Sequence, residues 1–489
     1  MPVKSLLPEE GQMKAIGLRF VIDSLSPDSP YGVEKIQDAA PFAKRERAQL
    51  LDALYNVRQA VAYADDERFA EISLLLHRFK NIRNAIKKCE QSYLHEVELF
   101  EVKQFLLLLE KLRFVYNALN EKTCFKHIVL TDMTEALDIL DPNKRRLAPF
   151  ALSEMNNPAL MAIRVEKTRL EGLLNSEADQ GVRESLKQER LHWVAREEAE
   201  ETKAKKNLSQ ALRPFLNAFY ENMAHIGELD FTIQKARLAL RYGAVCPNIV
   251  KDGGDIIFDG MFNPEIADIL AKTGKRFTPV SLTLSVGTTI LTGANMGGKS
   301  VAIKTAVLNM LLGHMGFFVF AEKCAMPLFA GIYLISEDLQ SIDQGLSTFG
   351  AEIVRLNDVL QHAHTDALFI ALDELARGTN PEEGAVIVRA VAKRLNKSRC
   401  HCFMSTHYDN VAGVGCAHYQ VAGLTHVNFE KWRDAAQKAI NGIDAIADQM
   451  DYRLVKMHGG QKPPRDALNI CRLLALDKHI LDEIESILQ

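Results

Sequence analysis

The sequence of 489 residues lacks the segments that direct a protein to a membrane or out of the cell. No run of about 18 apolar residues occurs, so no segment is long enough to span a membrane as a helix. Met1 to Gly11 contain no apolar core of a secretion signal. The eight cysteines are scattered and only Cys400 and Cys402 are close, which disfavours a disulfide framework or a metal site. We therefore expect a cytoplasmic protein with reduced thiols.

The sequence also lacks an excess of positive charge. It has 59 basic and 63 acidic residues, with a formal net charge of −4. No global basic field therefore draws the chain to nucleic acid, although the sequence is compatible with a local basic face. The content of 47% hydrophobic and 25% charged residues is typical of a soluble globular protein, and the length allows two to four domains.

A glycine-rich loop is the most informative motif that the chain contains. Residues 293–300 read Gly-Ala-Asn-Met-Gly-Gly-Lys-Ser, between an apolar run at 288–291 and a helix-like stretch from Val301. Backbone N–H groups of such a loop bind a phosphate chain, helped by the positive end of the following helix. The alternative is a plain glycine turn at a helix start. The residues expected to contact a nucleoside triphosphate are Gly293, Asn295, Gly297, Gly298, Lys299 and Ser300.

A pair of acids forms the second half of the expected site. The apolar run 367–372 reads as a buried parallel strand, and Asp373 and Glu374 follow it directly. We expect Asp373 and Ser300 to hold Mg²⁺, Lys299 to reach the outer phosphates of ATP, and Glu374 to polarise the attacking water. The alternative is an acidic helix start. Together with the glycine loop, the acid pair predicts hydrolysis of ATP with Mg²⁺ as cofactor.

The order of these motifs resembles the ATPase domain of the MutS family of DNA mismatch repair proteins. The resemblance covers about Gly260 to His407 closely. Its motifs here are 295–300, 346–349 with Glu352, 373–374 followed by 377–379, and 405–407. The resemblance implies an α/β P-loop NTPase domain of the ABC type, with a mostly parallel sheet. It also implies that an all-α core domain with helical arms precedes this domain.

The resemblance assigns three further residues to the site. It implies that Ser347 opens a helix whose N-terminus faces the nucleotide of the opposite subunit, so that the complete site requires a dimer. It implies that His407 senses or positions the terminal phosphate, beside the catalytic Glu374 and Lys299, and that Phe277 stacks on the adenine. The duller alternatives are a helix N-cap for Ser347, a hydrogen-bonded strand-end histidine for His407, and a core aromatic for Phe277.

Composition and resemblance together predict four segments. Residues 1–160 form a helical core domain, 161–235 a charged helical arm, 236–425 the ATPase domain, and 426–489 a C-terminal helical segment for dimerisation. Residues 165–206 carry nine basic and ten acidic residues, with a hairpin tip expected at Gln180 and Gly181. A surface that grips DNA should be clearly positive, so a solvated charged face is favoured over a DNA clamp.

Two kinds of partner remain open for a homodimeric ATPase of this kind. The first hypothesis is DNA, in repair or recombination of mismatched or branched structures. The second is a protein, because some MutS-like ATPases without the mismatch-reading domain resemble reactivating factors of cobalamin-dependent aminomutases. The chain begins almost at the expected helical core, and its Phe-x-Glu sequences at 69–71 and 320–322 lie outside any such domain. A nucleotide-binding scaffold without turnover is a third possibility.

Overall fold

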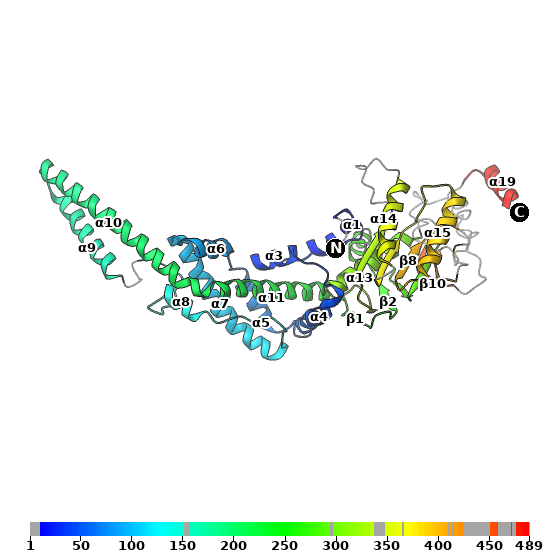
Figure 1. Cartoon of the computed structure of the whole chain (residues 1–489), viewed down its shortest axis with the longest axis horizontal. Coiled ribbons are helices and arrows are strands. Elements are labelled where there is room, and N and C mark those ends of the chain that lie inside the picture. Colours follow the sequence, from blue (N-terminus) through cyan, green and yellow to red (C-terminus); the bar gives the residue numbers. More distant parts are fainter. Residues whose placement is uncertain are drawn as a thin grey trace. The chain divides into compact units, whose positions relative to one another are not determined.

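The computed structural model describes residues 10–150, 152, 157–293, 297–336, 348–363, 366–408, 411, 415–423, 450–457, 471 and 476–488. The chain divides into two compact units (Figure 1). Unit 1 contains Met1–Leu25, Ala39–Val61 and Lys235–Gln489, and unit 2 contains Ser26–Asp38 and Ala62–Gln234. The described part of unit 2 is helical, and both β sheets lie in unit 1.

Unit 2 is organised around α7 (Glu96–Thr123), a helix of 28 residues. The apolar run Phe105–Leu109 within it is buried, and Phe105 packs against the rings of Phe79 and Tyr31.

None of the described helices is both long enough and apolar enough to cross a membrane. The remaining helices of unit 2 are α3 (Pro30–Gln37), α5 (Glu67–Leu76), α6 (Arg83–Gln91), α8 (Thr134–Leu140), α9 (Pro158–Ser176), α10 (Gln180–Leu212), the 3₁₀ turn η3 (Arg213–Phe215) and most of α11 (Leu216–Tyr242).

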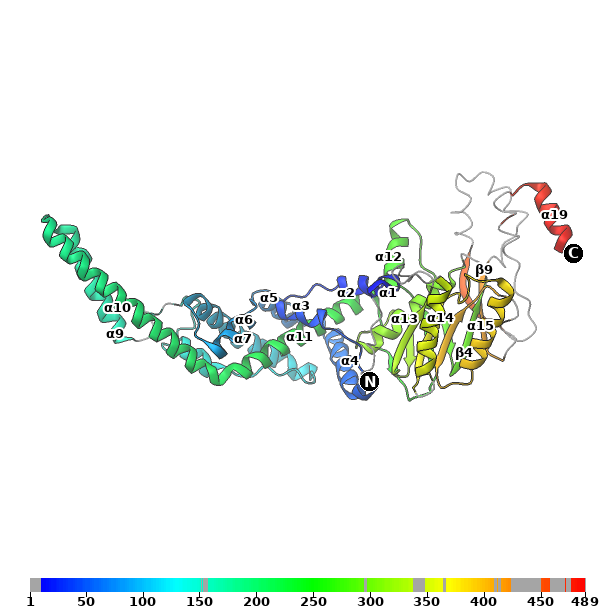
Figure 2. The same cartoon turned by 45° about the horizontal axis from the view of Figure 1, so that its top comes forward.

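Helices α9 and α10 run side by side as a charged pair, here called the arm (Figures 1 and 2). The two helices are joined at 177–179, so Gln180 and Gly181 begin α10 instead of forming the tip of the hairpin. Arg164 on α9 bonds Glu197 and Glu201 on α10 at 2.8 and 2.9 Å, and Arg190 bonds Glu171 at 2.9 Å. Acids of the neighbouring helix therefore neutralise several cations of the arm.

The described part of unit 1 contains two β sheets. The four-stranded sheet has the order β1-β5-β2-β3, in which β1 and β5 are parallel and β2 is antiparallel to both of its neighbours. The six-stranded sheet has the order β10-β9-β4-β8-β7-β6, and only the edge strand β10 is antiparallel. The strands are β1 (Asn248–Ile249), β2 (Ile256–Met261), β3 (Val280–Leu284), β4 (Gly287–Thr292), β5 (Lys323–Met326), β6 (Gly331–Ile335), β7 (Leu368–Leu372), β8 (His401–Ser405), β9 (Ala417–Gly423) and β10 (Asp451–Lys456).

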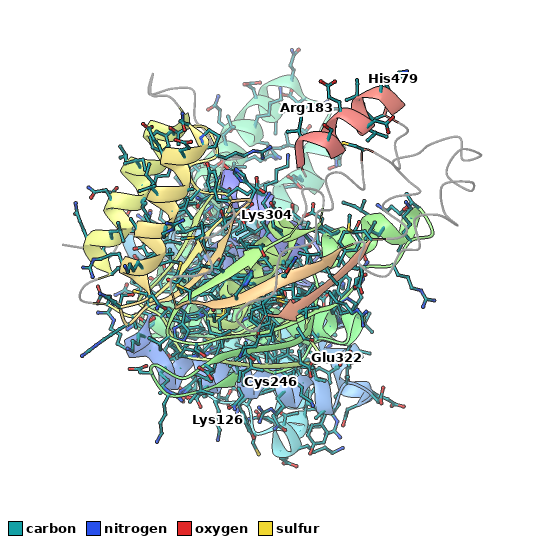
Figure 3. The ribbon with its side chains drawn as sticks, turned by 90° about the vertical axis from the view of Figure 1, so that its right-hand side faces the viewer. Lys126, Arg183, Cys246, Lys304, Glu322 and His479 are labelled. Carbon is teal, nitrogen blue, oxygen red and sulfur yellow. The ribbon has the colours of Figure 1, made fainter. Side chains whose placement is uncertain are left out.

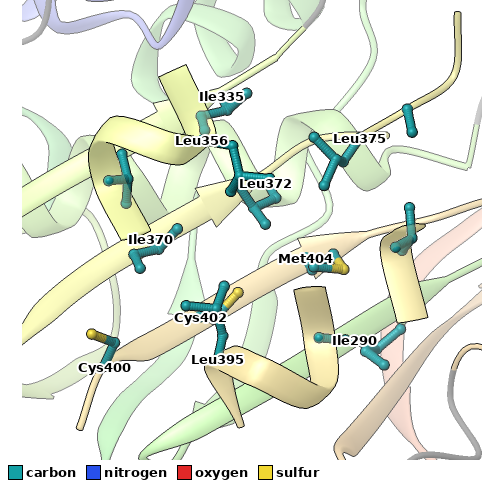
Figure 4. Close-up of a cluster of buried hydrophobic side chains, with 14 of the residues drawn as sticks. Ile290, Ile335, Leu356, Ile370, Leu372, Leu375, Leu395, Cys400, Cys402 and Met404 are labelled. Atoms are coloured by element: carbon teal, nitrogen blue, oxygen red, sulfur yellow. The ribbon is translucent and has the colours of Figure 1, made fainter. Parts of the chain in front are cut away.

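Strand β7 is a continuous apolar run, as expected of a parallel strand that is covered on both faces. Every residue of β7 and β8 is buried. On one face, Ile370 and Leu372 of β7 and Cys402 and Met404 of β8 pack with Leu356 of α14 and Leu395 of α15 (Figure 4). The helices of unit 1 are α1 (Glu10–Ala15), α2 (Leu18–Asp23), the 3₁₀ turn η1 (Lys44–Glu46), α4 (Arg47–Ala62), α12 (Pro264–Lys272), α13 (Lys299–His314), α14 (Thr348–His362), α15 (Pro381–Leu395) and α19 (Lys478–Leu488).

Helix α13 is buried along almost its whole length, and a buried histidine ends it. The backbone N–H of Phe329 donates to Nε2 of His314 at 3.0 Å, so the ring proton is on Nδ1, which donates to the carbonyl of Met310 at 2.8 Å. Burial lowers the pKa of His314 to about 4, against the opposing effect of the Met310 carbonyl. The imidazole is therefore neutral at physiological pH and acts as a fixed part of the core.

This burial predicts acid sensitivity. A histidine titrates at about 6.5 in the unfolded chain, so below that pH the unfolded state takes up a proton before the folded state does. The free energy of unfolding should fall by about 3 kcal/mol between pH 7.5 and pH 4 through His314 alone, given its folded pKa of about 4. Urea titrations at several pH values measure this slope. His314→Gln should flatten it and the exposed His192→Gln should not; equal slopes in both variants would contradict the assignment.

Candidate functional site

The glycine loop, residues 293–300, leaves β4 at the carboxyl edge of the six-stranded sheet, where ligands bind in open α/β sheets. Gly293 has φ 140° and Gly298 has φ 80°, backbone angles that residues with a side chain rarely adopt. A Cβ atom at Gly293 would lie 2.9 Å from Cβ of Val421, and one at Gly298 would lie 3.0 Å from Cδ1 of Tyr452. Side chains of β9 and β10 therefore crowd both positions, which favours glycine there.

Lys299 is the first residue of α13 and is 4% exposed. Its Nζ atom donates to the carbonyl oxygen of Gly293 at 2.9 Å and lies 3.5 Å from Oε1 of Glu374. Burial lowers the pKa of Lys299, and the charge of Glu374 opposes this effect. A buried ammonium in this place is suited to bind an anionic group that approaches the loop.

The acid pair, Asp373 and Glu374, follows β7 at the same edge of the sheet. Strand β8 lies between β4 and β7. Leu291 of β4 pairs with Ser405 of β8, and Leu372 of β7 pairs with Met404 of β8, so the three strands end close together. The hydroxyl of Ser405 donates to Oδ1 of Asp373 at 2.6 Å and accepts from the backbone N–H of Glu374 at 3.0 Å. Ser405 therefore fixes the orientation of both acids.

Glu374 faces two cations. Besides Lys299, Nη1 of Arg377 donates to Oε2 of Glu374 at 3.0 Å, although the Arg377 side chain is 53% exposed. The structure thus brings together Lys299 and Glu374, which are about 75 positions apart in the sequence. A cation and a carboxylate that share one sheet edge are the groups that phosphoryl transfer requires.

His407 follows β8 and has an exposed ring that lies 4.1 Å from the ring of Tyr408, measured between centroids. Partial desolvation of the ring lowers the pKa of His407. The charge of Glu374 opposes this change, and Lys299 and Arg377 reinforce it. These three charged groups belong to the glycine loop and to the acid pair's turn, so His407 senses the same local field.

The other predicted residues are distributed differently. Ser300 lies half-buried in the first turn of α13, and Gly297 lies in a bend just before that helix. Phe277 lies half-buried in the connection between α12 and β3. Asn295 and Ser347 lie outside the described residues, although α14 begins at Thr348, directly after Ser347.

The side chains at this edge of the sheet include oxygen groups of the kind that bind Mg²⁺. Within the described ranges, no group of three or more histidine, cysteine, aspartate or glutamate side chains is placed to hold a metal. Mg²⁺ is usually bound by one or two carboxylates together with water and substrate phosphates, without an all-protein cage. Asp373, aligned by Ser405, and the hydroxyl of Ser300 provide this kind of partial ligand set.

Comparison with known proteins matches part of the chain to a protein family. Residues 289–451 match the family model described as MutS domain V, a range that includes the glycine loop, the acid pair and His407. The chain is 23% identical over 521 residues to Endonuclease MutS2 of Caldanaerobacter subterraneus subsp. tengcongensis, covering 94% of this chain. Residues 289–451 therefore match a MutS domain, and the names of the relatives support a MutS family protein.

Other MutS relatives align over shorter parts. Endonuclease MutS2 of Streptococcus uberis is 26% identical over 358 residues, which is 71% of this chain and 43% of the relative. The DNA mismatch repair protein Msh3 of Dictyostelium discoideum is 31% identical over 265 residues, which is 52% of this chain and 18% of the relative. The chain spans 61% of the length of the Caldanaerobacter MutS2 protein.

Three residues of this MutS chain belong to the site but were absent from the predicted set. They are Ser405, which bonds the acid pair, Arg377, which bonds Glu374, and Tyr408, which bonds the turn that follows. Both Ser405 and Arg377 stand inside motifs that carried the family resemblance, which is the signal that could have found them. Tyr408 had only its position next to His407 as a signal.

Proposed function

We propose that this MutS chain binds ATP with Mg²⁺ at the glycine loop and hydrolyses it. The observation that carries the proposal is the approach of Lys299 to Glu374 at 3.5 Å, beside an Asp373 that Ser405 aligns at 2.6 Å. Phosphoryl transfer depends on positioned cations, a metal ligand and a group that orients the attacking water. The family match, which spans all of these residues, supports the same function.

Each residue has a separate role in the proposal. Lys299 and the glycine-loop amides, with Asn295 among them, bind the phosphates, and Glu374 accepts the proton of the attacking water. Asp373 and Ser300 hold Mg²⁺, which when bound neutralises charge on the phosphate oxygens. His407, with its lowered pKa, is neutral at physiological pH and orients the terminal phosphate by a hydrogen bond. Phe277 stacks on the adenine.

We also propose a dimer in which Ser347 of one chain completes the site of the other. The predicted division into a core domain (1–160), an arm (161–235), an ATPase domain (236–425) and a dimerisation segment (426–489) belongs to this proposal. Most of 426–489 lies outside the described residues, which contain β10 and α19 from that segment. The exposed Ile480 and Ile487 of α19 offer apolar surface for a second chain.

The proposed partner of this dimer is DNA of the mismatched or branched kind. The names of the relatives support it, because one is a DNA mismatch repair protein and others are endonucleases. The test is ATP turnover of the purified chain with and without homoduplex, mismatched and four-way-junction DNA. We expect DNA to raise turnover, and DNA binding to weaken at least about tenfold between 50 and 200 mM salt, because phosphate contacts release counterions. Turnover that no DNA changes, with no salt-sensitive binding, would contradict this proposal.

One observation favours a protein partner as the second candidate function. Acids of the facing helix of the arm form ion pairs with Arg164, Lys167 and Arg190. These cations would otherwise be available to bind the phosphates of DNA. A remodeller such as a reactivating factor of a cobalamin-dependent aminomutase needs no positive arm. The same turnover assay separates the candidates, since a remodeller is indifferent to DNA and co-purifies with a protein.

A further inference from the structure

The turn that follows Glu374 has an uncommon backbone conformation. Glu374 has φ 50° and Ala376 has φ 62°, so two residues with side chains adopt the left-handed region within three positions. That region is disfavoured for residues other than glycine, and it persists where surrounding contacts hold the chain in place. We call residues 374–376 the Ala376 turn. Its conformation sets the direction in which the Glu374 side chain leaves the backbone.

Contacts from two other segments hold Ala376, which is buried. The backbone N–H of Ala376 donates to Oε2 of Glu352 on α14 at 3.1 Å. The hydroxyl of Tyr408, just after β8, donates to the carbonyl oxygen of Ala376 at 2.8 Å. Both polar backbone groups of Ala376 therefore bond side chains that lie far from it in the sequence, and neither bond depends on regular secondary structure.

A glycine on α15 makes room for the tyrosine hydroxyl. A Cβ atom on Gly384 would lie 2.2 Å from the hydroxyl oxygen of Tyr408, 2.7 Å from its Cζ atom and 3.1 Å from the carbonyl oxygen of Ala376. Any side chain at position 384 would push the phenol away from the Ala376 turn. Burial, and then the charge of Glu352, raise the pKa of Tyr408, so its hydroxyl stays protonated and continues to donate.

We propose that Tyr408 is a positioning residue for Glu374, acting through the Ala376 carbonyl, and that Glu352 and Gly384 complete this support. The inference rests on the proposed ATP hydrolysis. Glu374 bonds Arg377 and lies beside Lys299 because the Ala376 turn aims its carboxylate at the glycine loop. Tyr408 sets the geometry of the carboxylate that orients the water and does not itself contact the nucleotide.

The test is Tyr408→Phe, which removes one oxygen and keeps the ring. We expect kcat for ATP to fall about 5- to 15-fold, the effect of losing one hydrogen bond, while KM and the affinity for a fluorescent ATP analogue change less than twofold. Hydrogen–deuterium exchange without nucleotide should become faster in the peptide that contains 373–379. Gly384→Ala should also lower kcat, because it displaces the phenol. When it is added to the Tyr408→Phe variant, it should lower kcat by a smaller factor than in the wild type.

Tyr419→Phe is the matched control. Tyr419 is 6% exposed against 8% for Tyr408, and its hydroxyl also bonds a backbone, accepting from the N–H of Thr283 at 3.0 Å. Its removal should leave both kcat and the exchange of 373–379 unchanged. An unchanged kcat in Tyr408→Phe, or equal losses in kcat and in ATP affinity, would overturn the inference.

The outcome also separates this inference from the proposed function. If the wild-type chain releases no phosphate from ATP, the proposed function fails, and the exchange experiment alone then decides whether Tyr408 holds the Ala376 turn. If the wild type turns over ATP but Tyr408→Phe matches it in kcat and exchange, only the positioning role fails.

Discussion

Replacing Lys299 with alanine is expected to weaken ATP binding about 30- to 150-fold, because hydrogen bonds from a charged donor contribute roughly 2–3 kcal/mol. The ammonium lies buried between the carbonyl of Gly293 and the carboxylate of Glu374. Among the described groups around it, alanine would leave no other cation at that point of the loop. Exposed Arg377 bonds the other carboxylate oxygen of Glu374 and does not replace Lys299. Titration with a fluorescent ATP analogue in the presence of Mg²⁺ measures the change.

Lys304→Ala is the matched control for Lys299→Ala. Lys304 lies on the same helix, α13, five positions further from the glycine loop, and its half-buried side chain is labelled in Figure 3. This variant removes the same charge five positions away from Lys299, so ATP affinity should stay within about twofold of the wild type. An affinity for ATP in Lys299→Ala that equals that of the control would refute the assignment of the glycine loop.

Glu374→Gln is expected to lower ATP turnover by about 10²- to 10⁴-fold, the range that a positioned proton acceptor contributes. The amide keeps the size of the side chain and an oxygen that accepts from Arg377. It removes the basic carboxylate, so the affinity for ATP should be kept while hydrolysis becomes much slower. Phosphate release in single-turnover assays, with ATP affinity measured in parallel, separates these two effects.

Glu383→Gln on α15 provides the control for the loss of one carboxylate. Glu383 is exposed in the first turn of that helix, and its replacement should not change turnover. Turnover in Glu374→Gln within about threefold of the wild type would leave the chain a nucleotide-binding scaffold, the third possibility raised by the sequence.

Much of the candidate site was predictable because its motifs are local. The strand at 288–291, the helix after Ser300 and the strand at 367–372 were expected, and the structure has β4, α13 and β7 there. Each is encoded by neighbouring residues, through apolar runs and glycine placement. The arm was also expected as charged helices. Its hairpin tip was placed at Gln180, where the structure instead begins α10, since an Asp179 side chain caps that helix.

The rest depends on contacts that no local pattern encodes. No periodicity shows that β8 lies between β4 and β7, yet this order decides that Ser405 reaches both acids. The left-handed backbone at Glu374 and Ala376 runs against the preferences of both residues, and it exists because Glu352, Tyr408 and Gly384 surround it.

By itself, the sequence determined the chemistry that this protein carries: a lysine and serine after a glycine loop, and two acids after a buried strand. Only the tertiary structure decided that Lys299 lies 3.5 Å from Glu374 and that the Tyr408 hydroxyl bonds the carbonyl of Ala376 in the turn that begins at Glu374. The physical reason is that residue types and short-range periodicity are properties of neighbouring positions, whereas strand order and close packing join residues that the chain keeps far apart.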